Sequence, residues 1–267
     1  MLVFNPSEWI NLVLRWTHVF AAILWVGTTY YFTWLDVQLR RSERAGGSVW
    51  MVHSGGFYTV VKQKTLGVPP SDVHWFRWEA LATWVSGLML LGVVYYAGGL
   101  LVDASNPSVS ENVAKAIGVS VLIVGWVVYD LLVRTPLVRT GWAFAVVGLI
   151  LIVALAYGLG HVMSSRATYI HIGALFGTIM ASNVWMRILP PQRRMIAAVA
   201  RGETFDPALG EGAKERSKHN TFIVVPTVFL MISNHFPTAT YGNRYSLVTM
   251  AALIVVGWCA AAILRRT

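Results

Sequence analysis

Seven long apolar runs dominate this sequence and restrict the folds that it can adopt. Each run can cross a bilayer as a helix, which takes roughly 20 residues rising about 1.5 Å each. In lipid, a backbone N–H or C=O group must find its partner within the protein, and a helix provides those partners within one segment. We therefore predict an all-α integral membrane protein, a bundle of about seven transmembrane helices. The predicted spans are 8–34, 76–98, 113–133, 142–163, 168–188, 219–236 and 245–264.

The composition agrees with a membrane bundle. Hydrophobic residues make up 56% of the 267 residues and charged residues only 12%, a balance that is rare in soluble domains of this size. The segment before the first run lacks a basic region, so we do not expect a cleaved signal peptide. We predict that residues 1–267 form one membrane domain with two long cytoplasmic loops, 36–75 and 190–216.

The basic residues predict the orientation in the membrane. Lysine and arginine resist translocation, so the loops that stay in the cytoplasm carry most of them. All but four of the 21 lysines and arginines lie in the loops that follow the first, third, fifth and seventh runs. We therefore predict an N-terminus outside and a cytoplasmic C-terminus. The four on the opposite side are Arg15, Lys115, Arg166 and Arg244.

The net charge of +9 belongs mainly to this predicted cytoplasmic rim, which can hold anionic lipids. The charges are spread over several loops without an aromatic-lined module, so we expect no binding of nucleic acid. Cys259 is the single cysteine of the chain. A disulfide, a cysteine-based zinc cluster and a Cys-x-x-Cys-His haem attachment site are therefore excluded within the chain.

Four histidines are predicted to lie in the outer half of the membrane, on four different spans. Bis-histidine haem ligation needs two imidazoles that approach the iron from opposite faces between packed helices. We therefore predict one or two haem b groups. A histidine near the interface can also bond water or a lipid headgroup, and the sequence does not pair the ligands. The four candidate ligands are His18, His161, His171 and His235.

Residues near these histidines extend the prediction. Trp25 lies on the same face of the first span as His18, so we predict that it lies beside the cofactor. Thr178, Ser182 and Trp185 continue a stripe that begins at His171 on the fifth predicted span. The stripe is typical of an interior lining, although ordinary helix packing also uses small polar residues.

Four segments together resemble a known family. They are WTHVFAAILWVGTTYYFTWLD, VHSGGFYTVVKQK, VHWFRWEALATWVSGLMLL and MISNHFP. With them, nearly the whole chain looks like the membrane domain of the bacterial membrane-bound urate oxidases, also called urate hydroxylases. GGFY, HWFRWEA followed by TWVSG, and SNH are the distinctive parts.

The resemblance implies a multi-pass protein of the bacterial cytoplasmic membrane that oxidises urate to 5-hydroxyisourate and passes the electrons to a c-type cytochrome. In the family a cytochrome c domain commonly follows the membrane domain, but no haem c motif is present here. We therefore expect a separate cytochrome as acceptor. Alternatively, the chain is a haem-binding electron relay or anchor in a larger respiratory or photosynthetic membrane complex. A quinone could complete the path of the electrons, but the sequence identifies no residues that would bind it.

A urate site would need a cation, planar hydrogen-bonding groups and an aromatic surface, because urate is a flat anion. HWFRWEA supplies His74, Arg77 and Glu79 at the start of the second span, and HSGGFY could close over it with His53. His53, His74 or Glu79 would be the general base. Alternatively, the tryptophans of this segment belong to an interfacial belt, and Arg77 is a positive-inside charge paired with Glu79.

Overall fold

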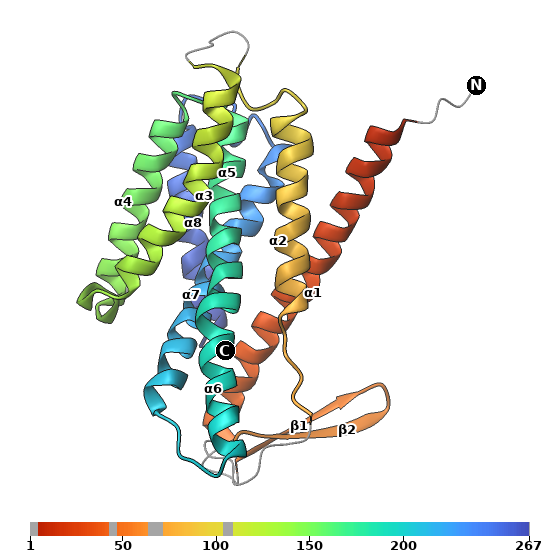
Figure 1. Cartoon of the computed structure of the whole chain (residues 1–267), viewed down its shortest axis with the longest axis vertical. Coiled ribbons are helices and arrows are strands. Elements are labelled where there is room, and N and C mark those ends of the chain that lie inside the picture. The colour runs from red at the N-terminus through yellow and green to blue at the C-terminus, as the bar shows by residue number, and fades with distance from the viewer. Residues whose placement is uncertain (1–4, 43–46, 64–71, 104–108, 267) are drawn as a thin grey trace.

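The computed structural model describes residues 5–42, 47–63, 72–103 and 109–266. Apart from one hairpin, the regular elements in these ranges are helical, as predicted (Figure 1). The α-helices are α1 Pro6–Ser42, α2 Trp78–Leu90, α3 Glu111–Val133, α4 Gly141–Leu159, α5 Ser165–Ser182, α6 Leu189–Ala200, α7 Pro207–Ile232 and α8 Ser246–Leu264. Two π-helical segments, η2 Leu91–Tyr96 and η4 Asn183–Ile188, continue α2 and α5, and short 3₁₀ helices are η3 Pro136–Arg139 and η5 Ser233–His235.

Six helices among the described residues are long and apolar enough to cross a membrane, which indicates a multi-pass membrane protein. They are α1, α2 with η2, α3, α4, the continuous helix from α5 to α6, and α8. The seventh predicted span, 219–236, falls in α7, which is not among the six. The first half of α7 is rich in charged and polar residues, so only its second half is apolar.

Two helices extend beyond the predicted spans. α7 begins at Pro207 rather than near residue 219, because Asp206 caps it by accepting a hydrogen bond from the N–H of Ala208 at 2.9 Å. An Asp-Pro pair is a strong start signal for a helix, but an apolar-run criterion does not register it. Likewise, α1 continues to Ser42, well into the predicted loop 36–75.

The predicted cytoplasmic loop 190–216 is also largely helical. α6 lies at its start and continues α5 without a break, which gives one helix of 36 residues. The π-helical turn η4 ends just before Pro190 and Pro191. A proline has no backbone N–H, so it cannot donate the hydrogen bond that an α-helix would form at its position. The π-helical turn before the two prolines pairs each carbonyl with an N–H five residues later instead of four.

Residues 48–61, within the predicted loop 36–75, form an antiparallel hairpin. Its strands are β1 Ser48–His53 and β2 Gly56–Val61, with His53 opposite Gly56. The two turn residues, Ser54 and Gly55, have φ angles of 49° and 76°. Positive φ at both central positions is typical of a type I′ turn, whose twist matches that of the flanking strands. In Figure 1 the hairpin projects from the end of the molecule where α1 ends, which we call the hairpin end.

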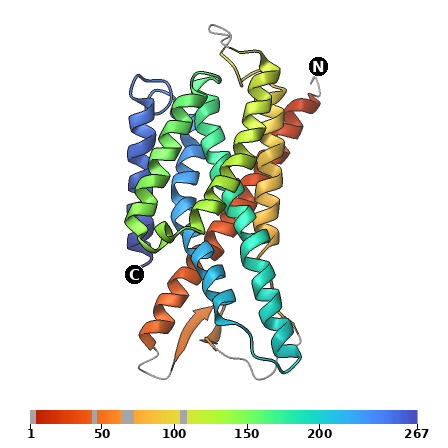
Figure 2. The ribbon, with the colours of Figure 1, turned by 60° about the vertical axis from the view of Figure 1, so that its left-hand side comes forward.

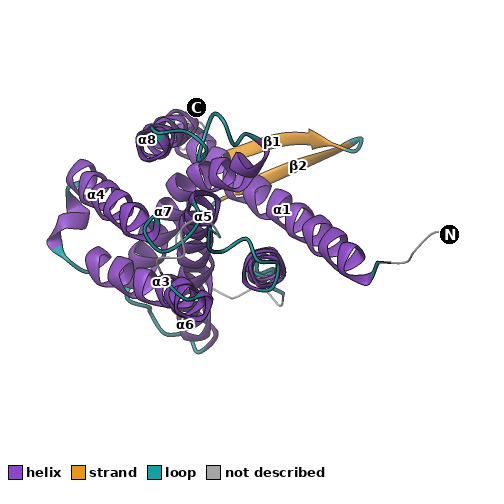
Figure 3. Cartoon of the chain, turned by 90° about the horizontal axis from the view of Figure 1, so that it is seen from above, coloured by secondary structure: helices purple, strands orange, loops and turns teal. Residues whose placement is uncertain are grey.

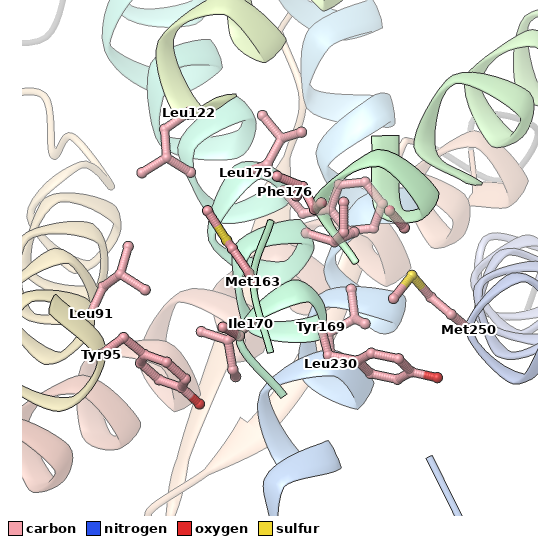
Figure 4. Packing of buried hydrophobic residues seen from close by; sticks show 14 of the residues in the cluster. Leu91, Tyr95, Leu122, Met163, Tyr169, Ile170, Leu175, Phe176, Leu230 and Met250 are labelled. Carbon is pink, nitrogen blue, oxygen red and sulfur yellow. The ribbon is translucent and has the colours of Figure 1, made fainter. Parts of the chain in front are cut away.

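The core surrounds α5, which is buried along most of its length. Figure 4 shows side chains from η2, α3, α5, α7 and α8 meeting there, including Tyr169, Leu175 and Phe176 of α5. Gly257 on α8 lets α7 approach closely, since an added Cβ would lie 3.0 Å from the Cδ of Pro226. Seen from above, α1 lies at the rim of the bundle and diverges from it toward the N-terminus (Figure 3). α1 therefore packs mainly against α2.

Candidate functional site

Aromatic side chains from several elements gather around Arg77 at the hairpin end. Arg77 precedes α2, and its guanidinium carbon lies 5.1 Å from the ring centroid of Trp78 and 5.9 Å from that of Trp185. Trp25, Trp75 and Trp185 all pack against one small buried group contributed by α2, η4 and α6. We call Trp25, Trp75, Arg77, Trp78 and Trp185 the tryptophan–arginine cluster. It joins Trp25, which we predicted beside the cofactor, to Arg77, which we predicted at the substrate site.

Two N–H groups of this cluster lack a partner. Nε of Arg77 and Nε1 of Trp185 are buried and make no hydrogen bond within the described residues. Arg77 does not form the predicted ion pair with Glu79, because its guanidinium group lies against the indole rings of Trp78 and Trp185 instead. A buried donor without an acceptor costs roughly 1–3 kcal/mol. Two such donors beside aromatic faces suit a flat ligand that is rich in acceptors.

The three predicted bases are placed differently around Arg77. Glu79 is half-buried in the first turn of α2, two residues after Arg77. His74 is exposed, and its ring packs edge to face on that of Phe76, with 4.6 Å between the ring centroids. His53 is exposed where β1 enters the hairpin turn, which points away from the start of α2 in Figure 1. The hairpin therefore does not close over Arg77 in this structure.

His18 lies where α1 contacts the middle of α2. Its Nδ1 is 2.9 Å from the carbonyl oxygen of Thr83 and 3.2 Å from the hydroxyl of Ser86. A carbonyl can only accept, so Nδ1 carries the proton and Nε2 keeps its lone pair. Metal-bound histidines commonly use this arrangement. Gly87 makes room for the ring, because an added Cβ would lie 2.9 Å from the Cε1 of His18.

Replacing Gly87 with alanine is expected to displace the His18 ring, and overpacking of this kind costs about 1–3 kcal/mol. Gly148 in α4 is a matched control, because an added Cβ there meets nothing within 4 Å. Alanine at that position should raise the free energy of unfolding by up to about 1 kcal/mol, because its helix propensity is higher than that of glycine. Thermal unfolding in one detergent should show a lower melting temperature for Gly87→Ala only. Equal melting temperatures would contradict the assigned role of Gly87.

His171 of α5 is fully buried, with η2 and α3 beside it. Its Nδ1 lies 2.8 Å from the carbonyl oxygen of Ala167, and its Nε2 lies 3.1 Å from the hydroxyl of Tyr96. Gly118 of α3 makes room for it, since an added Cβ would lie 2.7 Å from Nε2. Thr178 accepts a hydrogen bond from the indole of Trp84 at 3.1 Å. The polar stripe predicted on this helix therefore lies against α2, with Trp185 at its hairpin end.

The SNH motif contributes Asn234, rather than its histidine, to the contacts around His171. The Oδ1 of Asn234 accepts hydrogen bonds from the hydroxyl of Tyr95 at 3.2 Å and from Nε of Arg166 at 2.9 Å. Tyr95 in turn packs edge to face on His171 at 6.5 Å. His235 is the next residue of the motif, and its side chain is exposed.

The four predicted haem ligands do not lie in one layer. His18 contacts Ser86 and Gly87, whereas His171 contacts Tyr96, nine residues beyond Gly87 on the same helix. Nine residues correspond to about 14 Å along a helix, which is too far for two axial ligands of one iron. His161 and His235 are exposed in the segments that follow α4 and α7. Of these four histidines, His18 combines a hydrogen-bonded Nδ1 with an open Nε2 between α1 and α2.

A buried carboxylate binds three guanidinium groups where α3, η4 and α7 meet. Oδ1 of Asp130 accepts hydrogen bonds from Nη2 of Arg216 at 2.6 Å and Nε of Arg187 at 2.8 Å. Its Oδ2 accepts from Nη2 of Arg134 at 2.6 Å and Nη2 of Arg187 at 2.7 Å. The four donors occupy both oxygens of the carboxylate. We call Asp130 and these three arginines the Asp130 cluster.

Uncharged polar groups extend the Asp130 cluster into the bundle. Nδ2 of Asn183 donates to the hydroxyl of Tyr129 and to Oδ1 of Asn220, both at 2.9 Å. The Tyr129 hydroxyl also lies 2.9 Å from Nδ1 of His219. His219 is buried in α7. Because α7 begins a dozen residues before the predicted span, His219 lies inside the helix rather than at its start.

The sequence contains a signal for the Asp130 cluster. Asp130 and Arg134, and likewise Asn183 and Arg187, are four residues apart near the ends of two predicted spans. Such pairs share a helix face. Arg216 precedes the predicted span 219–236, which begins on the same predicted side of the membrane. The orientation therefore places all these groups at one level, although it does not show that they meet.

Residues 5–265 match the protein family described as urate oxidase N-terminal, so the match covers nearly the whole chain. The chain belongs to this family. It matches no curated protein and no solved structure. The family predicted from the sequence segments is thereby confirmed. In this urate oxidase N-terminal protein, GGFY begins at the hairpin turn, HWFRWEA leads into α2, and SNH forms η5.

Proposed function

We propose that this urate oxidase N-terminal protein is the membrane-embedded part of a urate-oxidising oxidoreductase. The proposal rests on two buried donors, Nε of Arg77 and Nε1 of Trp185, which lie beside indole rings and have no hydrogen-bond partner in the described part of the chain. Urate is a flat monoanion with carbonyl oxygens around its edge. Guanidinium and indole N–H groups can bond such an edge, and the neighbouring rings offer a stacking surface.

The proposed reaction joins urate to one oxygen atom from water, giving 5-hydroxyisourate, two protons and two electrons. Arg77 would stabilise negative charge on the purine while the oxygen–carbon bond forms. Glu79 is our choice as general base, because it is half-buried in the same turn as the cluster. His74 and His53, which are exposed, are less suited to a water-excluding site.

We propose that His18 would hold haem b, which would supply one-electron transfer when bound. His18 and Trp25 are seven residues apart and share a face of α1, so they are separated by about 10 Å along the helix. The tryptophan–arginine cluster is therefore close enough to deliver electrons to a group at His18. The final acceptor in this proposal is a c-type cytochrome or another member of a larger membrane complex.

Electron relay without urate chemistry is the second candidate function. The His18 site favours it, because an imidazole with an open Nε2 can hold haem whether or not a substrate binds at Arg77. Such a chain would accept electrons from a partner protein and would leave urate unchanged. The two candidates differ in whether urate itself reduces the bound group.

The test is addition of urate, without oxygen, to purified protein supplied with haem and a c-type cytochrome. We expect a b-type band in the reduced-minus-oxidised spectrum and urate-dependent reduction of the cytochrome. His18→Ala should lose the band, and His53→Ala, which changes an exposed histidine of the hairpin, should keep it. A haem band without urate-dependent reduction would favour the relay. Absence of both signals would overturn both functions.

A further inference from the structure

A cleft lined by arginines lies between the C-terminal ends of α1 and α8. Its volume is about 470 Å³, and four of its five lining residues are arginines. A hydrogen bond from Nη2 of Arg41 to the carbonyl oxygen of Arg266, 2.9 Å long, joins the two helix ends. The arginines thus come from opposite ends of the sequence. The lining residues are Val37, Arg40, Arg41, Arg265 and Arg266.

The neighbouring carboxylates are already engaged with other groups. Asp36, one turn before Arg40 on α1, pairs with Lys62 of the segment after β2. Glu215 of α7 pairs with Lys218 at 3.2 Å and with His219 at 3.1 Å. Among the described residues, these two carboxylates therefore pair with groups that do not line the cleft. An anionic ligand would neutralise part of the positive charge of its four arginines.

Arg265 lines the cleft and contacts α7. Its Nη1 donates to the hydroxyl of Thr221 at 3.3 Å, and its guanidinium carbon lies 5.8 Å from the ring of Phe222. Burial, and then repulsion from Arg40, lowers the pKa of Arg265 below its ordinary value. A bound anion would stabilise the charged form of Arg265, because an opposite charge nearby favours ionisation.

The cleft lies at the end of a candidate membrane span. α8 ends at Leu264, and Arg265 is the next residue. Figure 2 shows α8 on the outside of the bundle, with the C-terminus at its lower end. Arginines directly after a span lie at the level of the lipid headgroups, and the leaflet that basic loops face is rich in anionic lipid.

We infer that this cleft binds the phosphodiester headgroup of an anionic phospholipid. A guanidinium group offers a planar fork of donors that matches phosphate oxygens. Free phosphate has the same chemistry, but the place of the cleft beside a span favours a headgroup held in the bilayer. The inference is independent of the proposed urate chemistry, because the cleft shares no residue with the tryptophan–arginine cluster or with His18.

Binding can be measured with the purified full chain by native mass spectrometry and by thermal shift. Phosphatidylglycerol should be retained and should raise the melting temperature, whereas phosphatidylcholine should do neither. Inorganic phosphate at the same concentration should have no effect. Equal retention of phosphatidylcholine would overturn the inference, and so would equal stabilisation by inorganic phosphate, which would indicate a site for a soluble anion.

Two variants with the same change of charge complete the test. Arg40→Gln with Arg266→Gln changes two exposed side chains of the cleft and should weaken retention of phosphatidylglycerol at least tenfold. Arg194→Gln with Arg201→Gln changes two exposed arginines of the same basic end and should leave retention unchanged. Arg266→Glu alone is a second cleft variant in case the double one does not fold. Unchanged retention in a folded cleft variant would overturn the inference.

Discussion

Replacing Asp130 with alanine is expected to lower the melting temperature by roughly 10 °C or more, because breaking a buried ion pair costs about 3–5 kcal/mol. Three guanidinium groups would lose the carboxylate that they share. Arg216 is the most affected, since its side chain is only 7% exposed and cannot turn to solvent. Thermal unfolding of the purified variant in detergent measures the loss.

Two further variants separate charge from packing. Asp36→Asn removes an aspartate whose ion-pair partner among the described residues, Lys62, has a side chain that is 57% exposed, and exposed pairs contribute only about 0–1 kcal/mol. Its melting temperature should therefore stay close to that of the parent. Arg216→Met in the Asp130→Ala background should recover part of the loss by removing the unpaired buried charge. A double variant less stable than Asp130→Ala would contradict this electrostatic explanation.

Replacing Arg77 with glutamine is expected to reduce urate-dependent cytochrome reduction about 100-fold. The variant loses a charge-assisted hydrogen bond to the urate anion, worth up to about 3 kcal/mol, and each 1.36 kcal/mol is a factor of about ten in rate. It also loses the cation that lies over Trp78 and Trp185. Steady-state rates with varied urate measure the effect on kcat/KM.

Three comparisons make the Arg77 result specific. Arg194→Gln removes an exposed arginine of α6 and should keep the parental rate. Arg77→Lys keeps the charge but not the planar fork, so it should recover only part of the rate. The haem spectrum should be unchanged in all three variants, because His18 does not depend on Arg77 for its hydrogen bonds. A parental rate in a folded Arg77→Gln variant would remove Arg77 from the proposed site.

Apolar runs predicted where helices would lie, but not where they would end. α1 and α7 are longer than their apolar parts, because a polar segment continues a helix when its backbone hydrogen bonds and its cap allow it. The sequence also did not predict that α5 continues into α6, since two consecutive prolines usually indicate the end of a helix. In each case hydrophobicity reports the lipid environment of a segment rather than its backbone conformation.

The candidate site was predicted in pieces. Arg77 and Glu79 were identified from one segment, but their predicted pairing does not form, because Trp185 from a distant helix contacts Arg77. His18 and His171 were placed in one layer by counting from predicted helix ends. The tilt of α1 against α2 instead brings His18 to the middle of α2, while His171 lies beside its end.

The sequence by itself determined that this protein is a bundle of helices suited to a membrane, which end carries the basic residues, and to which family it belongs. Those properties follow from composition and local pattern, which each segment carries with it. Only the tertiary structure decided which side chains meet: Arg77 with Trp185, Asp130 with three arginines, and Arg41 with the carbonyl of Arg266. These contacts join residues far apart in the chain, so they depend on helix lengths and tilts that arise from packing.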